Sequence, residues 1–176
     1  MTDNLRDLTE YFKRQNIVVL LIGGYAMEIY GVIRQTLDID FLISDEYFDK
    51  IKKRMSEKGY RLIAETENFM RFYNFEASLS DIDFLVVNET TFENLFKKSK
   101  SGKVGTAQCN VPSVEHLIAL KLHAIKNNPD REARDIADIV ELTRKNSSEI
   151  TSDTLKLYCD EYGPENIFEK IRKYLK

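Results

Sequence analysis

Two aspartates separated by one residue carry the strongest chemical signal in the chain. Asp38 and Asp40 lie in the stretch Leu37–Ile43, which we predict to be a strand. Because side chains alternate along a strand, both carboxylates should share one face while the apolar neighbours point into the core. Two such carboxylates repel each other, and Mg²⁺ relieves the repulsion because it binds carboxylates together with substrate phosphates. The pattern therefore predicts metal-assisted phosphoryl or nucleotidyl transfer.

A second acidic strand is predicted about forty residues later, over Leu79–Val87. Asp81 and Asp83 again share one face, with Ile82 on the other. Either aspartate could complete a set of three carboxylates. Surface salt bridging at strand ends is the alternative role for all of these residues.

A glycine pair precedes the first acidic strand. Gly23 and Gly24 follow the apolar run Ile17–Ile22, predicted to be a buried strand, and precede a short predicted helix over residues 25–30. Glycines let a backbone approach a ligand closely, and a helix N-terminus presents free N–H groups to a phosphate. The glycine-rich loop that ends in Gly-Lys-Ser/Thr is missing, so this is not a P-loop. A simple tight turn is the alternative.

In combination, these motifs resemble a known superfamily. Ile22-Gly23-Gly24, thirteen further residues and Asp38-Ile39-Asp40-Phe41 are similar to the signature of the DNA polymerase β superfamily of nucleotidyltransferases. The longer form GGYAMEIYGVIRQTLDIDF looks more specifically like AbiEii-type and MenT-type toxins and related uncharacterised bacterial proteins. The later segments HLIALKLHAI and RDIADIVEL look like their downstream motifs. The resemblance covers roughly residues 17–142.

The resemblance implies a role for each matching residue. It implies metal binding by the family's carboxylates, matched here by Asp38, Asp40 and Asp83, with Asp81 the weaker match for the third. It implies nucleotide binding by Gly23, Gly24, Arg34 and Thr36, and a catalytic role for Lys121 beside the three carboxylates. Arg134, Asp135 and Asp138 match a further helical motif of the family.

Lys121 and the Arg-Asp helix have ordinary structural alternatives. Lys121 shares a predicted helix face with Leu117 and Ile125, so it either extends to water or reaches a triphosphate or the carboxylates. Arg134 and Asp138 are four residues apart, which favours a helix ion pair.

The resemblance also implies the reaction. The protein is expected to use Mg²⁺ or Mn²⁺ and to move a nucleoside monophosphate from a nucleoside triphosphate such as ATP to an acceptor. The acceptor is a tRNA end, a protein or a small molecule, and an antitoxin partner is expected if the protein is the toxin of a toxin–antitoxin system. The alternative is a non-catalytic nucleotide-binding or antitoxin-like module that retains the fold.

The elements around these motifs predict an α+β protein. A mixed sheet with flanking helices, of nucleotidyltransferase fold, is expected over residues 1–112, including a strand near 104–111, and a helical region over residues 113–176. The net charge of −3 argues against binding nucleic acid by bulk charge alone. The N-terminal segment does not resemble a signal peptide and no apolar run is as long as a membrane span, so we expect a cytoplasmic protein without a membrane partner.

Overall fold

The computed structural model describes residues 2–76 and 79–175 and divides into two compact units. The first comprises residues up to 29 together with residues 33–112, and the second comprises residues 30–32 together with those from 113 onward. The mixed α/β architecture predicted from the sequence is confirmed. That residues 1–112 and 113–176 are separate domains stays a prediction.

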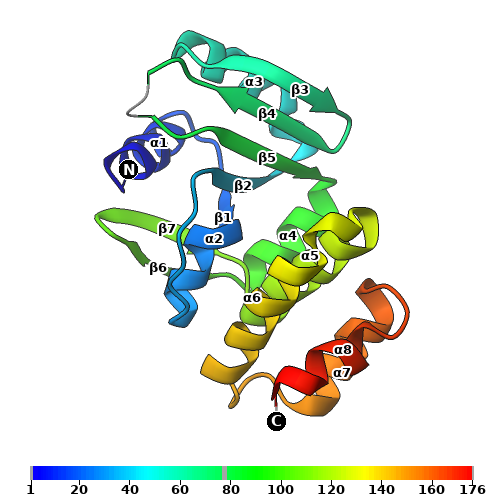
Figure 1. The fold of residues 1–176 in the computed structure, drawn as a ribbon. Coiled ribbons are helices and arrows are strands. Elements are labelled where there is room, and N and C mark those ends of the chain that lie inside the picture. Colours follow the sequence, from blue (N-terminus) through cyan, green and yellow to red (C-terminus); the bar gives the residue numbers. More distant parts are fainter. Residues whose placement is uncertain (1, 77–78, 176) are drawn as a thin grey trace. The chain divides into compact units, whose positions relative to one another are not determined.

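A five-stranded mixed sheet forms the centre of the first unit (Figure 1). Its strands are β1 (Leu20–Ile22), β2 (Ile39–Ser44), β3 (Arg61–Thr66), β4 (Phe69–Tyr73) and β5 (Ile82–Val87), in the spatial order β1-β2-β5-β4-β3. The pairing of β2 with β5 is parallel, and those of β1 with β2, β4 with β5 and β3 with β4 are antiparallel. Strands far apart in the sequence therefore lie side by side at the centre of the sheet.

An aromatic cluster fills the core on one face of this sheet. Phe41 of β2 and Phe84 of β5 stack with ring centroids 5.7 Å apart, because the parallel register places them opposite each other. Phe12 of helix α1 (Thr2–Arg14) meets both rings edge to face, at 5.4 and 5.9 Å. Phe72 of β4 extends the cluster, with its centroid 5.8 Å from that of Phe84. Such offset and edge-to-face contacts add to the free energy of burying the rings.

Short helices connect the strands of this unit. They are α2 (Gly23–Ala26), the 3₁₀ helices η1 (Met27–Tyr30) and η2 (Asp45–Tyr47), α3 (Phe48–Glu57) and α4 (Glu89–Lys97). Three predicted strand boundaries shift, one of them at β5, which begins at Ile82 instead of Leu79, so that Asp81 lies just before it. The first strand is shorter than residues 17–22, and the glycine pair is the start of α2 instead of a break before it. The second strand begins at Ile39, so Asp38 lies in the bend just before it.

The end of the first unit differs from the prediction. One strand was expected near residues 104–111, but the chain forms a hairpin of β6 (Lys100–Val104) and β7 (Ala107–Val111). Gly105, at a φ of +57°, begins its two-residue turn. Left-handed backbone of this kind suits glycine and closes tight hairpins.

The second unit is helical, as predicted. It contains α5 (Val114–Asn127), the 3₁₀ helix η3 (Pro129–Arg131), α6 (Glu132–Lys145), α7 (Ser152–Tyr162) and α8 (Ile167–Leu175). Ser113 caps α5 by accepting a hydrogen bond from the His116 amide. Residues 30–32 belong to this unit, where Asn146 donates a hydrogen bond to the Tyr30 carbonyl at 3.2 Å. None of the described helices combines the length and the apolar character needed to cross a membrane.

The aromatic cluster makes Phe41 a test of the core. Replacing Phe41 with alanine should lower the free energy of unfolding by about 3–5 kcal/mol, because a fully buried ring leaves a cavity between two strands and α1. Urea unfolding followed by circular dichroism measures the change. Phe75→Ala is the matched control: its ring is 72% exposed, and we expect a change within about 0.5 kcal/mol. Equal effects of the two substitutions would contradict this account of the core.

Candidate active site

Strand pairing brings two of the predicted carboxylates together. In the parallel register of β2 and β5, Asp40 stands directly opposite Asp83. Because side chains alternate, both point to the face opposite the Phe41 and Phe84 rings. Asp81 lies one residue before β5, where its carbonyl accepts a hydrogen bond from the Ile39 amide at 2.9 Å. The register therefore favours Asp83 over Asp81 as the partner of Asp40.

The glycine pair lies against this carboxylate. Ile22, the last residue of β1, pairs with Asp40, and Gly23 follows at a φ of +66°. A β-carbon on Gly23 would lie 2.0 Å from Asp40 Oδ2, so only glycine leaves room for the carboxylate. Helix α2 spans four residues before the chain tightens to a 3₁₀ helix. So short a helix has a small dipole, and its free N–H groups are what it offers a phosphate.

Arg34 and Thr36 lie against Gly24. A β-carbon on Gly24 would be 2.8 Å from the Thr36 β-carbon and 3.2 Å from Arg34 Cζ. Both side chains are half-buried, whereas Gln35 between them and the flanking Ile33 and Leu37 are exposed. This segment is part of no helix or strand, and its side chains at positions 34 and 36 approach the glycine in α2. The structure thus brings Gly23, Gly24, Arg34, Thr36, Asp38, Asp40 and Asp83 into one region of the first unit.

Arg71 is a site residue that the sequence did not reveal. It stands opposite Asp83 in the pairing of β4 with β5, and its guanidinium binds both Asp83 oxygens, from Nε at 2.7 Å and from Nη2 at 2.5 Å. The hydrogen bonds to Asp83 raise the pKa of Arg71, and the charges of Asp38 and Asp40 raise it further. All three carboxylates therefore attract this guanidinium. The aromatic pattern around Arg71 indicated only strand packing, so no sequence signal marked it.

The bidentate contact between Arg71 and Asp83 affects whether the carboxylates can form a metal site in this conformation. Asp83 is 7% exposed, and Arg71 occupies both of its oxygens. Among the residues that the structure describes, no three Asp, Glu, His or Cys side chains are arranged to hold a metal ion. Arg71 would therefore compete for the Asp83 oxygens with a metal shared by Asp38, Asp40 and Asp83.

Lys121 belongs to a buried charge cluster in the second unit. Its Nζ lies 2.5 Å from Asp138 Oδ2 and 3.4 Å from Asp135 Oδ1, and Arg131 Nε lies 2.9 Å from the other Asp135 oxygen. The Lys121 side chain is 8% exposed, so it does not extend to water. The spacing of Arg134 and Asp138 did not indicate this partner for Asp138. The catalytic role of Lys121 stays a prediction.

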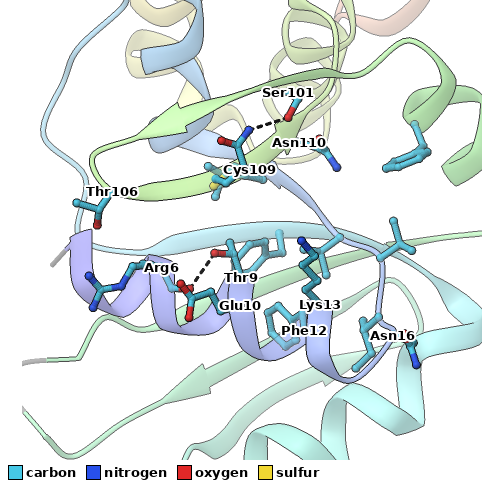
Figure 2. Close-up of a pocket in the computed structure, with 17 residues that line it drawn as sticks. Arg6, Thr9, Glu10, Phe12, Lys13, Asn16, Ser101, Thr106, Cys109 and Asn110 are labelled. Atoms are coloured by element: carbon cyan, nitrogen blue, oxygen red, sulfur yellow. Dashed lines mark hydrogen bonds between the residues drawn. The ribbon is translucent and has the colours of Figure 1, made fainter.

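A separate cavity of about 710 Å³ lies on the other face of the sheet. Figure 2 shows that Thr9, Glu10 and Lys13 of α1 line it on one side, opposite Ser101 and Cys109 of the hairpin. Phe12 and Phe41 are part of its wall, so the cavity is on the face away from Asp40. None of the predicted site residues lines it.

Comparisons with known proteins agree on the family and the fold. The sequence profile of a family described as an uncharacterised nucleotidyltransferase matches residues 1–176. No sequence among curated proteins matches significantly.

Solved structures of similar fold include the antibiotic-resistance factor ANT(2″)-Ia and a lincosamide antibiotic adenylyltransferase. ANT(2″)-Ia in complex with adenylyl-2″-tobramycin has a TM-score of 0.73 at 13% identity, over 92% of this chain and 98% of that one. The lincomycin-bound lincosamide antibiotic adenylyltransferase LnuA has a TM-score of 0.62 at 15% identity, over 81% and 96%. An antigenic nucleotidyltransferase-like protein from Paracoccidioides brasiliensis has a TM-score of 0.58 at 13% identity, over 99% and 91%. At these identities the likeness shows a common fold.

The contact between Gly23 and Asp40 can be tested by stability. Gly59→Ala introduces a β-carbon at a φ of +82° with nothing within 4 Å, so it should cost only the backbone term, about 1–2 kcal/mol. Gly23→Ala has the same backbone cost and also displaces the Asp40 side chain, so we expect a larger loss. Thermal unfolding of both variants measures the difference. A Gly23→Ala protein as stable as Gly59→Ala would show that the contact has no energetic weight.

The buried cluster predicts a large stability effect for Lys121. Lys121→Met leaves Asp135 and Asp138 with less compensating charge, and breaking a buried pair in this way costs about 3–5 kcal/mol. Lys126→Met, on the exposed side of the same helix, should change the free energy of unfolding by less than about 0.5 kcal/mol. Urea titration compares the two. Wild-type stability of Lys121→Met would mean that the cluster does not support the fold.

Proposed function

We propose that this chain, which belongs to the family described as an uncharacterised nucleotidyltransferase, is a transferase. It transfers a nucleoside monophosphate from a nucleoside triphosphate to a hydroxyl-bearing acceptor. One observation carries the proposal: Asp40 stands opposite Asp83 in the sheet, and its carboxylate fills the space that a side chain on Gly23 would take. A negatively charged metal-binding group is thereby held against backbone that is open to a phosphate.

The nucleotide is proposed to lie beside the glycine pair. The N–H groups at the start of α2 are available to phosphate oxygens, and Arg34 and Thr36 lie against Gly24 from the neighbouring segment. A guanidinium can bind two phosphate oxygens at once, and a threonine hydroxyl can donate one further hydrogen bond. Gly23 and Gly24 have no side chains of their own, which leaves room for Asp40, Thr36 and Arg34 to approach the backbone there.

The residues present suit a divalent cation that the carboxylates would hold. Asp38 and Asp40 supply oxygen ligands of the kind that Mg²⁺ or Mn²⁺ prefers, and Asp83 is the third candidate ligand. When bound, such a cation neutralises charge on the triphosphate and lowers the barrier to attack on phosphorus.

The reaction would proceed by displacement at the α-phosphate. The acceptor oxygen forms a bond to the α-phosphorus, the bond from that phosphorus to the bridging oxygen breaks, and pyrophosphate leaves with that electron pair. The acceptor hydroxyl gives up its proton, and the carboxylates at the junction of β2 and β5 are the closest bases to the proposed nucleotide position.

The identity of the acceptor would distinguish between several biological roles. Two proteins of similar fold are antibiotic adenylyltransferases, which suggests a small-molecule acceptor. The resemblance to AbiEii-type and MenT-type toxins suggests a tRNA or protein acceptor in the cytoplasm, with an antitoxin as partner. Lys121 is proposed to act in catalysis, because it lies in the segment HLIALKLHAI, which looks like a downstream motif of these toxins.

A non-catalytic module is the second candidate, and one observation favours it. Arg71 already occupies both oxygens of Asp83, as in a site that retains the fold without turnover. Binding of nucleotide is expected of both candidates, so only turnover separates them.

Transfer is tested by supplying each triphosphate labelled at the α-phosphorus, with Mg²⁺ or Mn²⁺, to RNA, protein and small-molecule fractions of a cell extract. Nucleotidyl transfer moves the α-label into the acceptor, whereas the same triphosphate labelled at the γ-phosphorus leaves the acceptor unlabelled. The labelled fraction identifies the acceptor class. Labelling from the γ-position would indicate phosphoryl transfer instead, and no labelling from any triphosphate would favour the non-catalytic module.

Asp40→Asn should abolish most of the activity without unfolding the protein. The substitution keeps the size of the side chain and removes its charge, so turnover should fall by at least about a hundredfold, as for the loss of one catalytic electrostatic group. Thermal stability without metal should be unchanged or higher, because repulsion with Asp38 is relieved. Transfer assays at saturating Mg²⁺ and thermal melts measure the two effects. Full activity of the variant would refute the mechanism.

Asp81→Asn is the matched control for the second acidic strand. Asp81 lies outside the register that places Asp83 beside Asp40, so we expect less than about a tenfold loss of turnover, against about a hundredfold for Asp83→Asn. The reverse order would assign the third catalytic carboxylate to Asp81.

A further inference from the structure

Arg71 and Asp83 form a pair whose two members differ in freedom to move. The Arg71 side chain is 43% exposed, whereas that of Asp83 is 10% exposed. Asp83 stands in the central strand β5, flanked by β2 and β4. If the pair separates, the arginine is the member that has room to leave.

Arg71 is placed where it could bind either Asp83 or the phosphates of the proposed nucleotide. Its guanidinium is attracted by Asp38 and Asp40 as well as by the bound Asp83. It therefore stands beside the carboxylates at which the proposed triphosphate and cation would bind. A guanidinium pairs with phosphate oxygens in the same two-pronged geometry that it uses with a carboxylate. An arriving triphosphate can thus replace the partner that Arg71 gives up.

We propose that Arg71 is a positioning residue that withholds Asp83 from the divalent cation until a nucleoside triphosphate draws the guanidinium away. Without nucleotide, Arg71 supplies the positive charge that the three carboxylates require. With nucleotide, its charge moves to the phosphates and Asp83 becomes available as the third ligand. Cation and nucleotide then bind cooperatively. The inference rests on the proposed function, because it assigns a nucleoside triphosphate to this site.

The same face of the sheet offers a control for charge alone. Arg61 of β3 pairs with Tyr73 of β4, which alternation places on the same face as Arg71. Arg61 is exposed, and the pairing places it next to Tyr73 rather than opposite Asp83. Arg61→Gln therefore removes one positive charge from this face and leaves the Asp83 pair intact.

The test measures Mn²⁺ binding without turnover, from the electron paramagnetic resonance signal of free Mn²⁺. Without nucleotide, Arg71→Gln should bind Mn²⁺ about tenfold more tightly than the wild type, and Arg61→Gln less than about threefold more tightly. Arg71→Lys keeps the charge and loses the two-pronged geometry, so its affinity should fall between those of Arg71→Gln and the wild type. Equal effects of Arg71→Gln and Arg61→Gln would overturn the proposal.

A double substitution shows whether the gain acts through Asp83. In an Asp83→Asn background, Arg71→Gln should no longer tighten Mn²⁺ binding, since the freed ligand is gone. A gain that persists in that background would show that Arg71 acts by charge alone and would overturn the proposal. Thermal melts confirm that each variant is folded, and Mn²⁺ should raise the melting temperature of Arg71→Gln more than that of the wild type.

Nucleotide coupling completes the test. A triphosphate analogue with a methylene group between the α- and β-phosphorus should tighten Mn²⁺ binding more in the wild type than in Arg71→Gln, where Asp83 is already free. Equal tightening in both would overturn the proposal. Wild-type protein that shows this coupling but transfers no label to any acceptor would contradict the proposed transferase activity and leave the role of Arg71 supported.

Discussion

The parallel pairing of β2 with β5 is the constraint on which the site depends. Its register places Asp40 opposite Asp83 on one face and stacks Phe41 on Phe84 on the other. Because side chains alternate along both strands, burial of the rings and presentation of the carboxylates follow from the same register. A slip of one residue would bury charge and expose the aromatic cluster. Packing of the core therefore maintains the geometry of the candidate active site.

The ion pairs of the two units differ in their exposure to water. In the first, Arg71 balances the charge of Asp83, and its side chain is 43% exposed. In the second, Lys121 of α5 is held by Asp135 and Asp138 of α6, and all three side chains are buried. A buried group bound by two opposite charges loses much when it leaves them, whereas a pair with one half-exposed member is weakened by water. The first arrangement suits an exchange during a reaction, and the second stabilises the packing of α5 against α6.

The family and the fold identify the class of protein but not the acceptor of the transferred group. Family membership establishes the chain as a nucleotidyltransferase, and the structural likeness to antibiotic adenylyltransferases establishes the fold. Proteins of one fold can differ in the surfaces that bind their substrates. The exposed Ile33 and Leu37, next to Arg34 and Thr36, and the aromatic strand β4 are the surfaces nearest the site where such differences would act.

Local signals in the sequence were enough to predict the glycine pair, the acidic strands and the mixed α+β class, because each depends on the alternation or backbone freedom of consecutive residues. The sequence predicted one strand near residues 104–111 in place of the hairpin of β6 and β7, because the turn that begins at Gly105 was not recognised. Only the tertiary structure decided that Asp83 faces Asp40, that Arg71 binds Asp83 and that Lys121 binds Asp138. Each of these contacts joins different elements, and strand register and helix packing are set by the whole core rather than by neighbouring residues.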